Sequence, residues 1–256
     1  MVDEMKIAKE TLKTIQKQFD LDCNLKEAEE ILQNKVYLSR SQSLDGARIV
    51  VNTDLFFRAI IFMGKAYIMT DESIFDGCKE LFKNARPEWF CEFSNLRIID
   101  HILSEYDREI ADTHIYFLPD YEAKVVEDNR DTKWFNEKEI RDMKDTNIFH
   151  NALCYSTTQP DIIAVAAMDG NIMKGMAGAS LDGRYVRQIG IDVLEQYQNE
   201  GLATYLTTIL KQKILKEGLI PFYGTSESHS ISRNVAIHSG FLPAWAEIYV
   251  KRKTKE

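Results

Sequence analysis

Apolar residues recur at helical spacing in four segments of the first half of the chain. In the first segment they share one helical face and are Ala8, Leu12, Ile15 and Phe19. The second segment covers residues 24–33, with Asn24 in the position of an N-cap. The third and fourth cover residues 74–81 and 92–109. This spacing predicts four helices.

Residues 47–70 show a different pattern, in which apolar and polar positions alternate on both sides of the dipeptide Gly64-Lys65. Alternation is typical of half-buried strands, and glycine beside a polar residue marks a turn. We therefore expect a set of short antiparallel strands here, and a further strand over residues 113–119.

The polar segment 119–133 follows, and it is the best candidate for a join between two parts. A chain of 256 residues, 45% of them hydrophobic, is long enough for two domains with cores of their own. We therefore expect an N-terminal α/β domain over residues 1–120 and a second domain over residues 121–256.

Turn signals separate three apolar runs in the second domain. Asp169-Gly170 and Asp182-Gly183 lie between the runs 162–168, 172–181 and 184–194. Asp-Gly between apolar runs indicates a hairpin, because glycine accepts a positive φ without a steric penalty. An antiparallel meander of three strands is expected. A short helix should precede it, because Asn136 and Glu139 have the spacing of an N-cap and its N3 carboxylate.

A polar turn, Gln198 to Gly201, separates the last of these strands from a long amphipathic helix. The apolar positions of that helix are Leu202, Leu206, Ile209, Leu210 and Ile214. Gly218 follows, where a helix C-terminus favours a left-handed residue, and residues 219–225 read as another strand. The unit is thus strand, turn, helix and strand, which predicts a right-handed crossover with the polar turn at its mouth.

The turn lies where a phosphate group would be attracted. The first N–H groups of a helix have no intrahelical partner, and the helix dipole adds roughly half a positive charge there. Gly201 has no Cβ to hold a ligand away from the backbone, and the small Ala203 leaves the next turn accessible. The same residues also suit an ordinary tight connection in which glycine serves only the turn.

Charge and composition exclude several classes of protein. A net charge of -8 gives no basis for a nucleic-acid partner, since phosphate contacts need clustered Lys and Arg. No apolar run approaches the ~20 residues that span a bilayer, and the charged start of the chain is unlike a signal peptide. We therefore expect a soluble cytoplasmic protein with no membrane partner. The 4 cysteines form no C-x-x-C pair and the 5 histidines show no ligand spacing, so no metal is expected.

The pattern Gln-x-x-Gly-x-Ala from Gln198 to Ala203, after a meander and before a long helix, resembles the acyl-CoA-binding loop of the GNAT superfamily of N-acyltransferases. Residues 234–241, which end in Gly-Phe, resemble the family's second helix, and residues 244–252 its final strand. The resemblance covers roughly the second half of the chain. It implies an α/β (α+β) fold with a mixed, mostly antiparallel central sheet flanked by helices.

The resemblance also implies a function, in which acetyl-CoA passes its acetyl group to a primary amine by direct attack in a ternary complex. Amides of the turn would hold the pyrophosphate, and exposed backbone near Ile191 and Val193 would pair with the pantetheine arm like an added strand. An N–H near Val193 would polarise the thioester carbonyl. The implied cofactor-binding residues are Ile191, Val193, Gln198, Asn199, Glu200, Gly201, Leu202, Ala203 and Thr204.

Two departures from the family pattern concern charge and acid catalysis. Gln198 stands where many relatives have arginine, and Glu200 adds negative charge, so phosphate binding would depend on amides and the helix dipole. Ala236 replaces the tyrosine that often protonates the leaving thiolate. As substitutes we consider Tyr249, Ser230, His238 and Tyr223, each of which could instead be an ordinary packed residue. Asp192 could take a proton from the amine through water or make a structural hydrogen bond.

Other interpretations stay open. A GNAT fold without turnover would bind acyl-CoA as a sensor or interaction module, and the missing tyrosine favours that alternative. A Ser–His hydrolase is set aside, since residues 226–232 hold adjacent polar residues and no G-x-S-x-G elbow. The amine acceptor is left open among small amines, aminoglycoside-like compounds, amino acids and peptides, and the oligomeric state between monomer and homodimer. The N-terminal domain is either a diverged half of the same fold or a domain that shapes the acceptor site.

Overall fold

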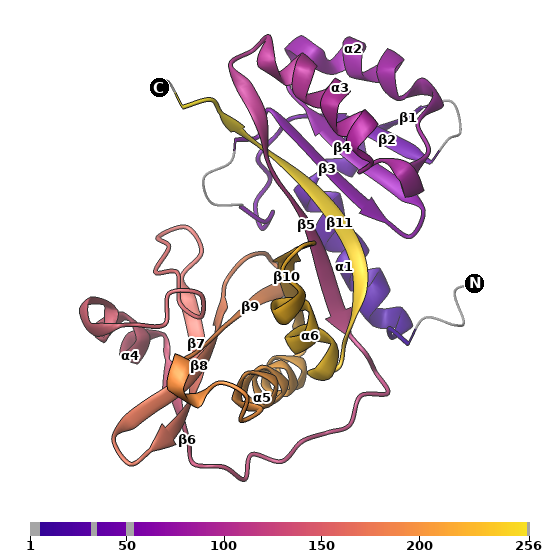
Figure 1. Ribbon diagram of the computed structural model, residues 1–256. Coiled ribbons are helices and arrows are strands. Elements are labelled where there is room, and N and C mark those ends of the chain that lie inside the picture. Colours follow the sequence, from indigo (N-terminus) through magenta and orange to yellow (C-terminus); the bar gives the residue numbers. More distant parts are fainter. Residues whose placement is uncertain (1–5, 32–34, 50–53, 255–256) are drawn as a thin grey trace. The chain divides into compact units, whose positions relative to one another are not determined.

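The computed structural model (Figure 1) describes residues 6–31, 35–49 and 54–254. The chain forms two compact units. Unit 1 consists of Met1–Ile15, Phe117–Thr225 and His229–Pro243, and unit 2 of Gln16–Tyr116, Ser226–Ser228 and Ala244–Glu256. The expected boundary after residue 120 would give two continuous domains, and the observed units differ from it at both ends of the chain. The start of the chain belongs with the second half, and most of the last strand belongs with the first half.

Unit 2 is built on a mixed sheet. Its strands lie in the order β1 (Glu29–Glu30), β2 (Val36–Arg40), β4 (Lys65–Thr70), β3 (Phe57–Phe62), β11 (Phe241–Arg252) and β5 (Arg108–Pro119). β2 and β4 are parallel, whereas β3 is antiparallel to both β4 and β11. The antiparallel strands expected within residues 47–70 are thus confirmed as β3 and β4, joined by a turn at Met63-Gly64. Residues 50–53 of that segment lie outside the described part.

Helices cover both faces of this sheet. Figure 1 shows α2 (Glu72–Leu81) and α3 (Phe93–Ser104) side by side, and their apolar residues share one core with β2, β3 and β4. On the other face lies the second half of α1 (Lys9–Asp22), where Phe19 packs edge-on against Phe62 and Trp245 at centroid distances of 5.3 Å. Because strand residues alternate between faces, Arg58 and Glu247 point to the α1 side.

The prediction of a helix over residues 24–33 was wrong for those of its residues that the structure describes. Only a 3-10 turn, η1 (Leu25–Glu27), forms, and β1 follows it. Asn24 does not cap a helix: it has a left-handed backbone, and its side-chain amide donates to Glu27, Gln42 and the carbonyl of Arg40. The tertiary partners of Asn24 therefore override its local preference. Residues 32–34 lie outside the described part.

Unit 1 contains a second sheet, in the order β6 (Thr132–Asn136), β7 (Asp161–Asp169), β8 (Ile172–Ser180), β9 (Val186–Val193) and β10 (Ile220–Ser226). The pairings from β6 to β9 are antiparallel, and β9 and β10 are parallel. The expected meander is confirmed, with Gly170 at a φ of 56° in its first turn. The mixed, mostly antiparallel fold class inferred from the sequence is likewise confirmed.

The helices α4, α5 and α6 lie wholly within unit 1. α4 (Glu137–Asp142) begins with the expected capping box between Asn136 and Glu139, and α6 (Ser230–His238) precedes the final strand. α5 (Leu202–Lys216) packs against β7, β8 and β9. The opposite face of β9 is crossed closely by the chain at Asn151, whose carbonyl oxygen would lie 2.0 Å from a Cβ on Gly190. Glycine is therefore required at that point of the strand.

Short 3-10 helices connect several elements: η2 (Phe82–Asn84), η3 (Pro87–Trp89), η4 (Lys144–Thr146) and η5 (Glu195–Tyr197). In the part of the chain that the structure describes, no helix combines the length and apolar character needed to cross a bilayer.

Candidate acyl-CoA site

The turn between β9 and α5 is exposed and adopts a left-handed backbone at two positions. Asn199 has a φ of 66° and Gly201, the N-cap of α5, a φ of 72°. A Cβ built on Gly201 would meet no atom within 4 Å. Glycine is therefore needed for the backbone conformation and not for packing within the protein. The space that it leaves open lies directly over the start of a 15-residue helix.

The first amides of α5 have no hydrogen-bond acceptor within the helix. The N–H of Tyr205 donates to the carbonyl of Gly201 at 3.0 Å, which is the first hydrogen bond of the helix. The amides of Leu202, Ala203 and Thr204 precede that bond, so helix geometry provides no intrahelical acceptor for them. Together with Asn199 and Gly201, these three residues are the amide donors that the resemblance implied.

Tyr205 also fixes a distant segment beside the helix start. Its hydroxyl donates to Asp128 at 2.9 Å and accepts from the amides of Asn129 and Arg130 at 3.1 and 3.2 Å. The Arg130 guanidinium lies 4.6 Å from the centre of the Tyr205 ring and donates to the carbonyl of Glu200 at 3.4 Å. A cation from outside the sequence pattern is thereby held against the turn.

A second cation reaches the turn from β8. Lys174 Nζ lies 2.8 Å from the Glu200 carboxylate and 4.9 Å from the centre of the Tyr197 ring. The hydrogen bond from Lys174 to Glu200 raises the pKa of the lysine above its ordinary value. The negative charge of Glu200 is thus balanced by Lys174. From the sequence we expected phosphate binding at this turn to depend on amides and the helix dipole alone. The structure places the cations Lys174 and Arg130 beside it. Sequence reasoning missed both cations because 26 and 70 residues separate them from Glu200.

One edge of β9 has only a short partner. β9 and β10 pair over three residues, from Val186 with Ile220 to Gln188 with Phe222, although β9 continues to Val193. The carbonyl of Tyr185 faces β10, since it accepts from Ile220, whereas the amide of Leu194 faces β8, since it donates to Lys174. Alternation along the strand therefore turns the backbone N–H and C=O groups of Ile191 and Val193 toward the β10 side. These are the two strand residues that the resemblance implied.

Asp192 is committed to structural hydrogen bonds. Its carboxylate accepts from the Asn151 amide at 2.5 Å, from the Asn151 side chain at 2.6 Å and from the Ala152 amide at 3.2 Å. These donors hold the segment that crosses Gly190. Of the two roles considered for Asp192, the geometry matches the structural one.

Tyr223 is the tyrosine closest in sequence to the end of the β9–β10 pairing. It follows Phe222, the last paired residue of β10, and its hydroxyl is 2.9 Å from the hydroxyl of Ser232 on α6. Burial raises the pKa of Tyr223 above its ordinary value; the hydrogen bond with Ser232 opposes this change, and the charge of Asp192 adds to it. The phenol is therefore protonated at neutral pH and can act as a proton donor.

The other candidates for acid catalysis are placed differently. Ser230 and His238 are exposed at the two ends of α6, and Ala236, at the family's tyrosine position, is fully buried. Tyr249 belongs to unit 2, where it is buried and its hydroxyl forms a hydrogen bond with that of Tyr116. Burial raises the pKa of Tyr249. The final strand, expected in the second domain, contributes only Phe241–Pro243 to unit 1.

No group of three or more His, Cys, Asp or Glu side chains is arranged to hold a metal ion among the residues that the structure covers. The four cysteines are all free thiols, and burial raises the pKa of Cys78 to about 12 and that of Cys91 to about 11.

Comparison with solved structures finds similar folds. One is a GCN5-related N-acetyltransferase-like protein from Streptococcus suis, with 13% identity, 80% of this chain and 89% of that chain covered, and a TM-score of 0.47. A GNAT-family acetyltransferase from Colwellia psychrerythraea has 11% identity, 96% and 97% coverage and a TM-score of 0.46. A GCN5-related N-acetyltransferase from Kribbella flavida has 12% identity, 82% and 91% coverage and a TM-score of 0.45.

No protein-family model matches the chain, and no curated protein matches it in sequence. The three solved structures are described as GNAT-family or GCN5-related acetyltransferases. At these identities and TM-scores the likeness concerns the fold, and the function has to be argued from the residues of this chain.

Proposed function

We propose that this protein is an N-acyltransferase that moves the acetyl group of acetyl-CoA to a primary amine. The observation that carries the proposal is the turn before α5: an open backbone at Gly201, amides at the helix start and two cations beside it. Helix-start amides beside an open glycine, with cations close by, are the kind of groups that bind a pyrophosphate.

The edge of β9 supports binding of the rest of the cosubstrate. Pantetheine carries two amide groups, and the backbone groups of Ile191 and Val193 that face the β10 side offer the hydrogen bonds of an added strand. A thioester whose arm runs along this edge would bring its carbonyl toward the N–H of Val193. That N–H would then stabilise the oxyanion that forms during the reaction.

The reaction needs no covalent enzyme intermediate. The neutral amine attacks the thioester carbonyl, the C–S bond breaks, the thiolate takes a proton and the new ammonium group loses one to water. We assign the proton donor to the Tyr223 phenol, which lies in the same unit as the turn and directly follows the β9–β10 pairing. Asp192 acts as a positioning residue, because its carboxylate is occupied by the crossing segment.

Two measurements test this function on the full chain. Calorimetry with acetyl-CoA at millimolar concentration should show binding, and the melting temperature should rise because the ligand binds only the folded state. Release of free thiol in the presence of a panel of amines should then exceed release without amine, with one acetylated amine formed for each thiol. If acetyl-CoA gives neither heat nor a thermal shift, the site assignment is wrong.

A second candidate function is an acyl-CoA sensor without turnover, and the absence of tyrosine at Ala236 favours it. This candidate predicts binding of acetyl-CoA, no amine-dependent thiol release with any member of the panel, and no effect of Tyr223→Phe on binding. An N-acyltransferase predicts that Tyr223→Phe lowers kcat and leaves the affinity for acetyl-CoA nearly unchanged.

A further inference from the structure

Among the residues that the structure describes, the hydroxyl of Tyr223 has one hydrogen-bond partner, the hydroxyl of Ser232 at 2.9 Å. The two groups come from different elements of unit 1, since Tyr223 lies on β10 and Ser232 on α6. The ring of Tyr223 packs against that of Phe241, with a distance of 6.2 Å between the ring centres. The phenol is therefore held in a defined position where the pairing of β9 and β10 ends.

The hydrogen bond between these hydroxyl groups can run in either direction. Each group carries one proton and can also accept, so the bond uses one of the two protons and leaves the other without an acceptor. When Tyr223 donates, its proton is engaged with Ser232 and is not directed at a ligand. When Ser232 donates, the phenol proton can point elsewhere. The direction of this bond thus decides whether Tyr223 can act as an acid.

Ser232 also affects the state that follows the loss of the phenol proton. A hydroxyl that donates to a phenolate makes a charge-assisted hydrogen bond, which is roughly twice as strong as one between neutral groups. Burial raises the pKa of Tyr223, and the hydrogen bond with Ser232 opposes that rise. Ser232 therefore stabilises the phenolate that proton transfer leaves behind.

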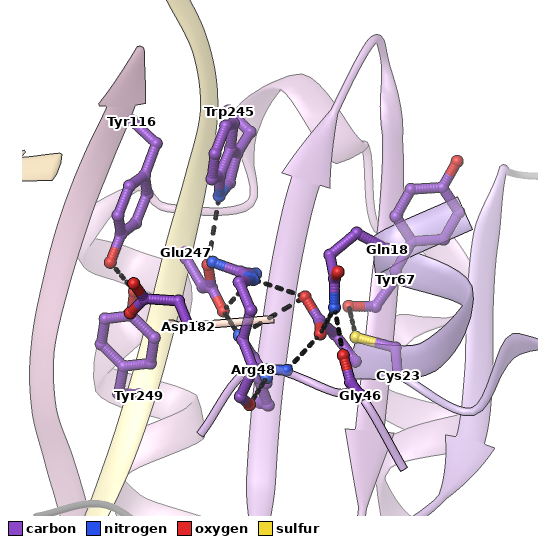
Figure 2. Close-up of polar contacts among 12 residues, drawn as sticks. Gln18, Cys23, Gly46, Arg48, Tyr67, Tyr116, Asp182, Trp245, Glu247 and Tyr249 are labelled. Carbon is purple, nitrogen blue, oxygen red and sulfur yellow. Dashed lines mark hydrogen bonds and ion pairs between the residues drawn. The ribbon is translucent and has the colours of Figure 1, made fainter. Parts of the chain in front are cut away.

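The two side chains differ in their access to water. Tyr223 is 4% exposed, whereas Ser232 is half-buried and reaches the surface. A proton from solvent therefore meets Ser232 before it meets Tyr223. The hydroxyl pair of Tyr116 and Tyr249 in unit 2 lacks this asymmetry, because both of its side chains are buried (Figure 2).

We propose that Ser232 is a positioning residue for Tyr223, which donates to the phenol oxygen, leaves the phenol proton free for the departing thiolate and returns a proton to the phenolate after each transfer. The inference rests on the proposed acyltransferase function and on Tyr223 as its proton donor.

The protons balance over one reaction cycle. The C–S bond breaks with its electron pair on sulfur, the phenol O–H bond breaks, and an S–H bond forms. Ser232 then gives its proton to the phenolate oxygen and takes one from water. The ammonium group formed by the attack loses one proton to water, so the proton drawn from water is replaced and no other reactant is needed.

Steady-state kinetics of the full chain, with acetyl-CoA and the amine that gives the fastest thiol release, test this role. Ser232→Ala should lower kcat about tenfold, as expected for the loss of one hydrogen bond to a charged group, and should leave the KM for acetyl-CoA nearly unchanged. Ser232→Thr retains a hydroxyl group and should keep kcat within about twofold of the wild type. Calorimetry with acetyl-CoA checks that each variant is folded and binds the cosubstrate.

A double variant shows whether Ser232 acts through Tyr223. In a Tyr223→Phe background no phenol proton is present, so Ser232→Ala should change kcat by less than about twofold. A purely structural role of Ser232 would lower kcat by the same factor with and without the phenol.

The outcomes distinguish this proposal from the proposed function. If the wild type shows amine-dependent thiol release, the role of Ser232 alone is overturned by any of three results: an undiminished kcat in Ser232→Ala, an equal loss in Ser232→Thr, or an equal loss in the Tyr223→Phe background. A Tyr223→Phe variant as fast as the wild type overturns it as well. Absence of amine-dependent thiol release in the wild type overturns both the function and the role of Ser232.

Discussion

At the scale of single residues, Gly201 matters both for the backbone conformation of the turn and for the access of the proposed ligand to it. Its φ of 72° favours glycine, and the space beside it is empty. Asparagine tolerates this backbone region better than most residues, so Gly201→Asn adds a side chain with little strain. We expect folding stability to change little and the affinity for CoA to fall about tenfold, because the new side chain occupies the pyrophosphate position.

Gly170 supplies the matched control. It also has a positive φ, 56°, with no atom within 4 Å of a built Cβ, but it lies in the turn between β7 and β8. Gly170→Asn should leave CoA affinity unchanged in calorimetry. Equal affinities for the two variants would mean that Gly201 serves only the turn.

The charge of the buried Lys211 side chain affects the stability of unit 1. Its ammonium group donates to the carbonyls of Ser239 and Gly240, at 2.5 and 3.0 Å, where α6 ends. Burial lowers the pKa of Lys211 to about 8, and the charge of Asp120 partly opposes this. Above pH 8 the folded protein therefore binds fewer protons than the unfolded chain, whose lysine titrates near ~10.4.

The free energy of unfolding should therefore rise with pH. At pH 7 the lysine is charged in both states, and the folded state carries the desolvation penalty. Between pH 8 and 10 that penalty is progressively removed, so the free energy of unfolding should gain up to about 2 to 3 kcal/mol from this group. Denaturant titrations of the wild type and Lys211→Met at pH 7.5 and 9.5 isolate the effect. A rise of equal size in both proteins would contradict it.

At the scale of elements, the start of α5 depends on residues brought to it by β8 and by the segment before β6. Lys174→Met and Arg130→Met should each weaken CoA binding roughly two- to fivefold, the range for one partly exposed charge near a helix terminus. Each should also reduce the dependence of affinity on salt, since screened charge is removed.

Lys133→Met is the control for these variants, because Lys133 on β6 likewise lies over an aromatic ring, that of Phe135, at 4.9 Å. Calorimetry at two salt concentrations should show CoA affinity unchanged in this control. If all three variants match the wild type in CoA affinity and in its salt dependence, neither cation contacts the phosphates and the helix amides are their only contacts.

At the scale of the whole molecule, the last strand completes the unit that the first half begins. Trp245 to Tyr249 pair with Phe62 to Arg58 on β3, and Glu247 is the partner of two buried arginines. Breaking a buried ion pair costs about 3 to 5 kcal/mol, against a total stability of about 5 to 15 kcal/mol. A fragment of residues 1–120 should therefore be unfolded by circular dichroism and by its amide NMR spectrum.

Restoring the strand should restore the fold. Residues 1–116 joined by a flexible linker to residues 244–256 contain most of unit 2, and we expect this protein to unfold cooperatively. A dispersed NMR spectrum from residues 1–120 alone would show that β11 is dispensable and that the ion pairs with Glu247 contribute little.

The sequence by itself determined most of unit 1, because its signals are local. Asp169-Gly170 defined a hairpin, Asn136 with Glu139 defined a helix start, and Gly201 before an amphipathic segment defined the turn at α5. Each depends on backbone preferences within a few residues, which the chain carries into any fold. The helix-start amides of the candidate site were predictable in the same way, whereas its strand edge at Ile191 and Val193 was implied only by the resemblance to the GNAT superfamily.

Tertiary structure alone decided the features that join residues far apart in the chain. Arg130 and Lys174 reach Glu200, and Glu247 reaches Arg48 across 199 positions. The side chain of Asn24 donates to Gln42 and does not cap a helix as predicted. The carboxylate of Asp192 accepts from Asn151. Charge and hydrogen-bonding capacity can be read from a sequence, but which groups satisfy each other depends on distances that exist only once the sheets have formed.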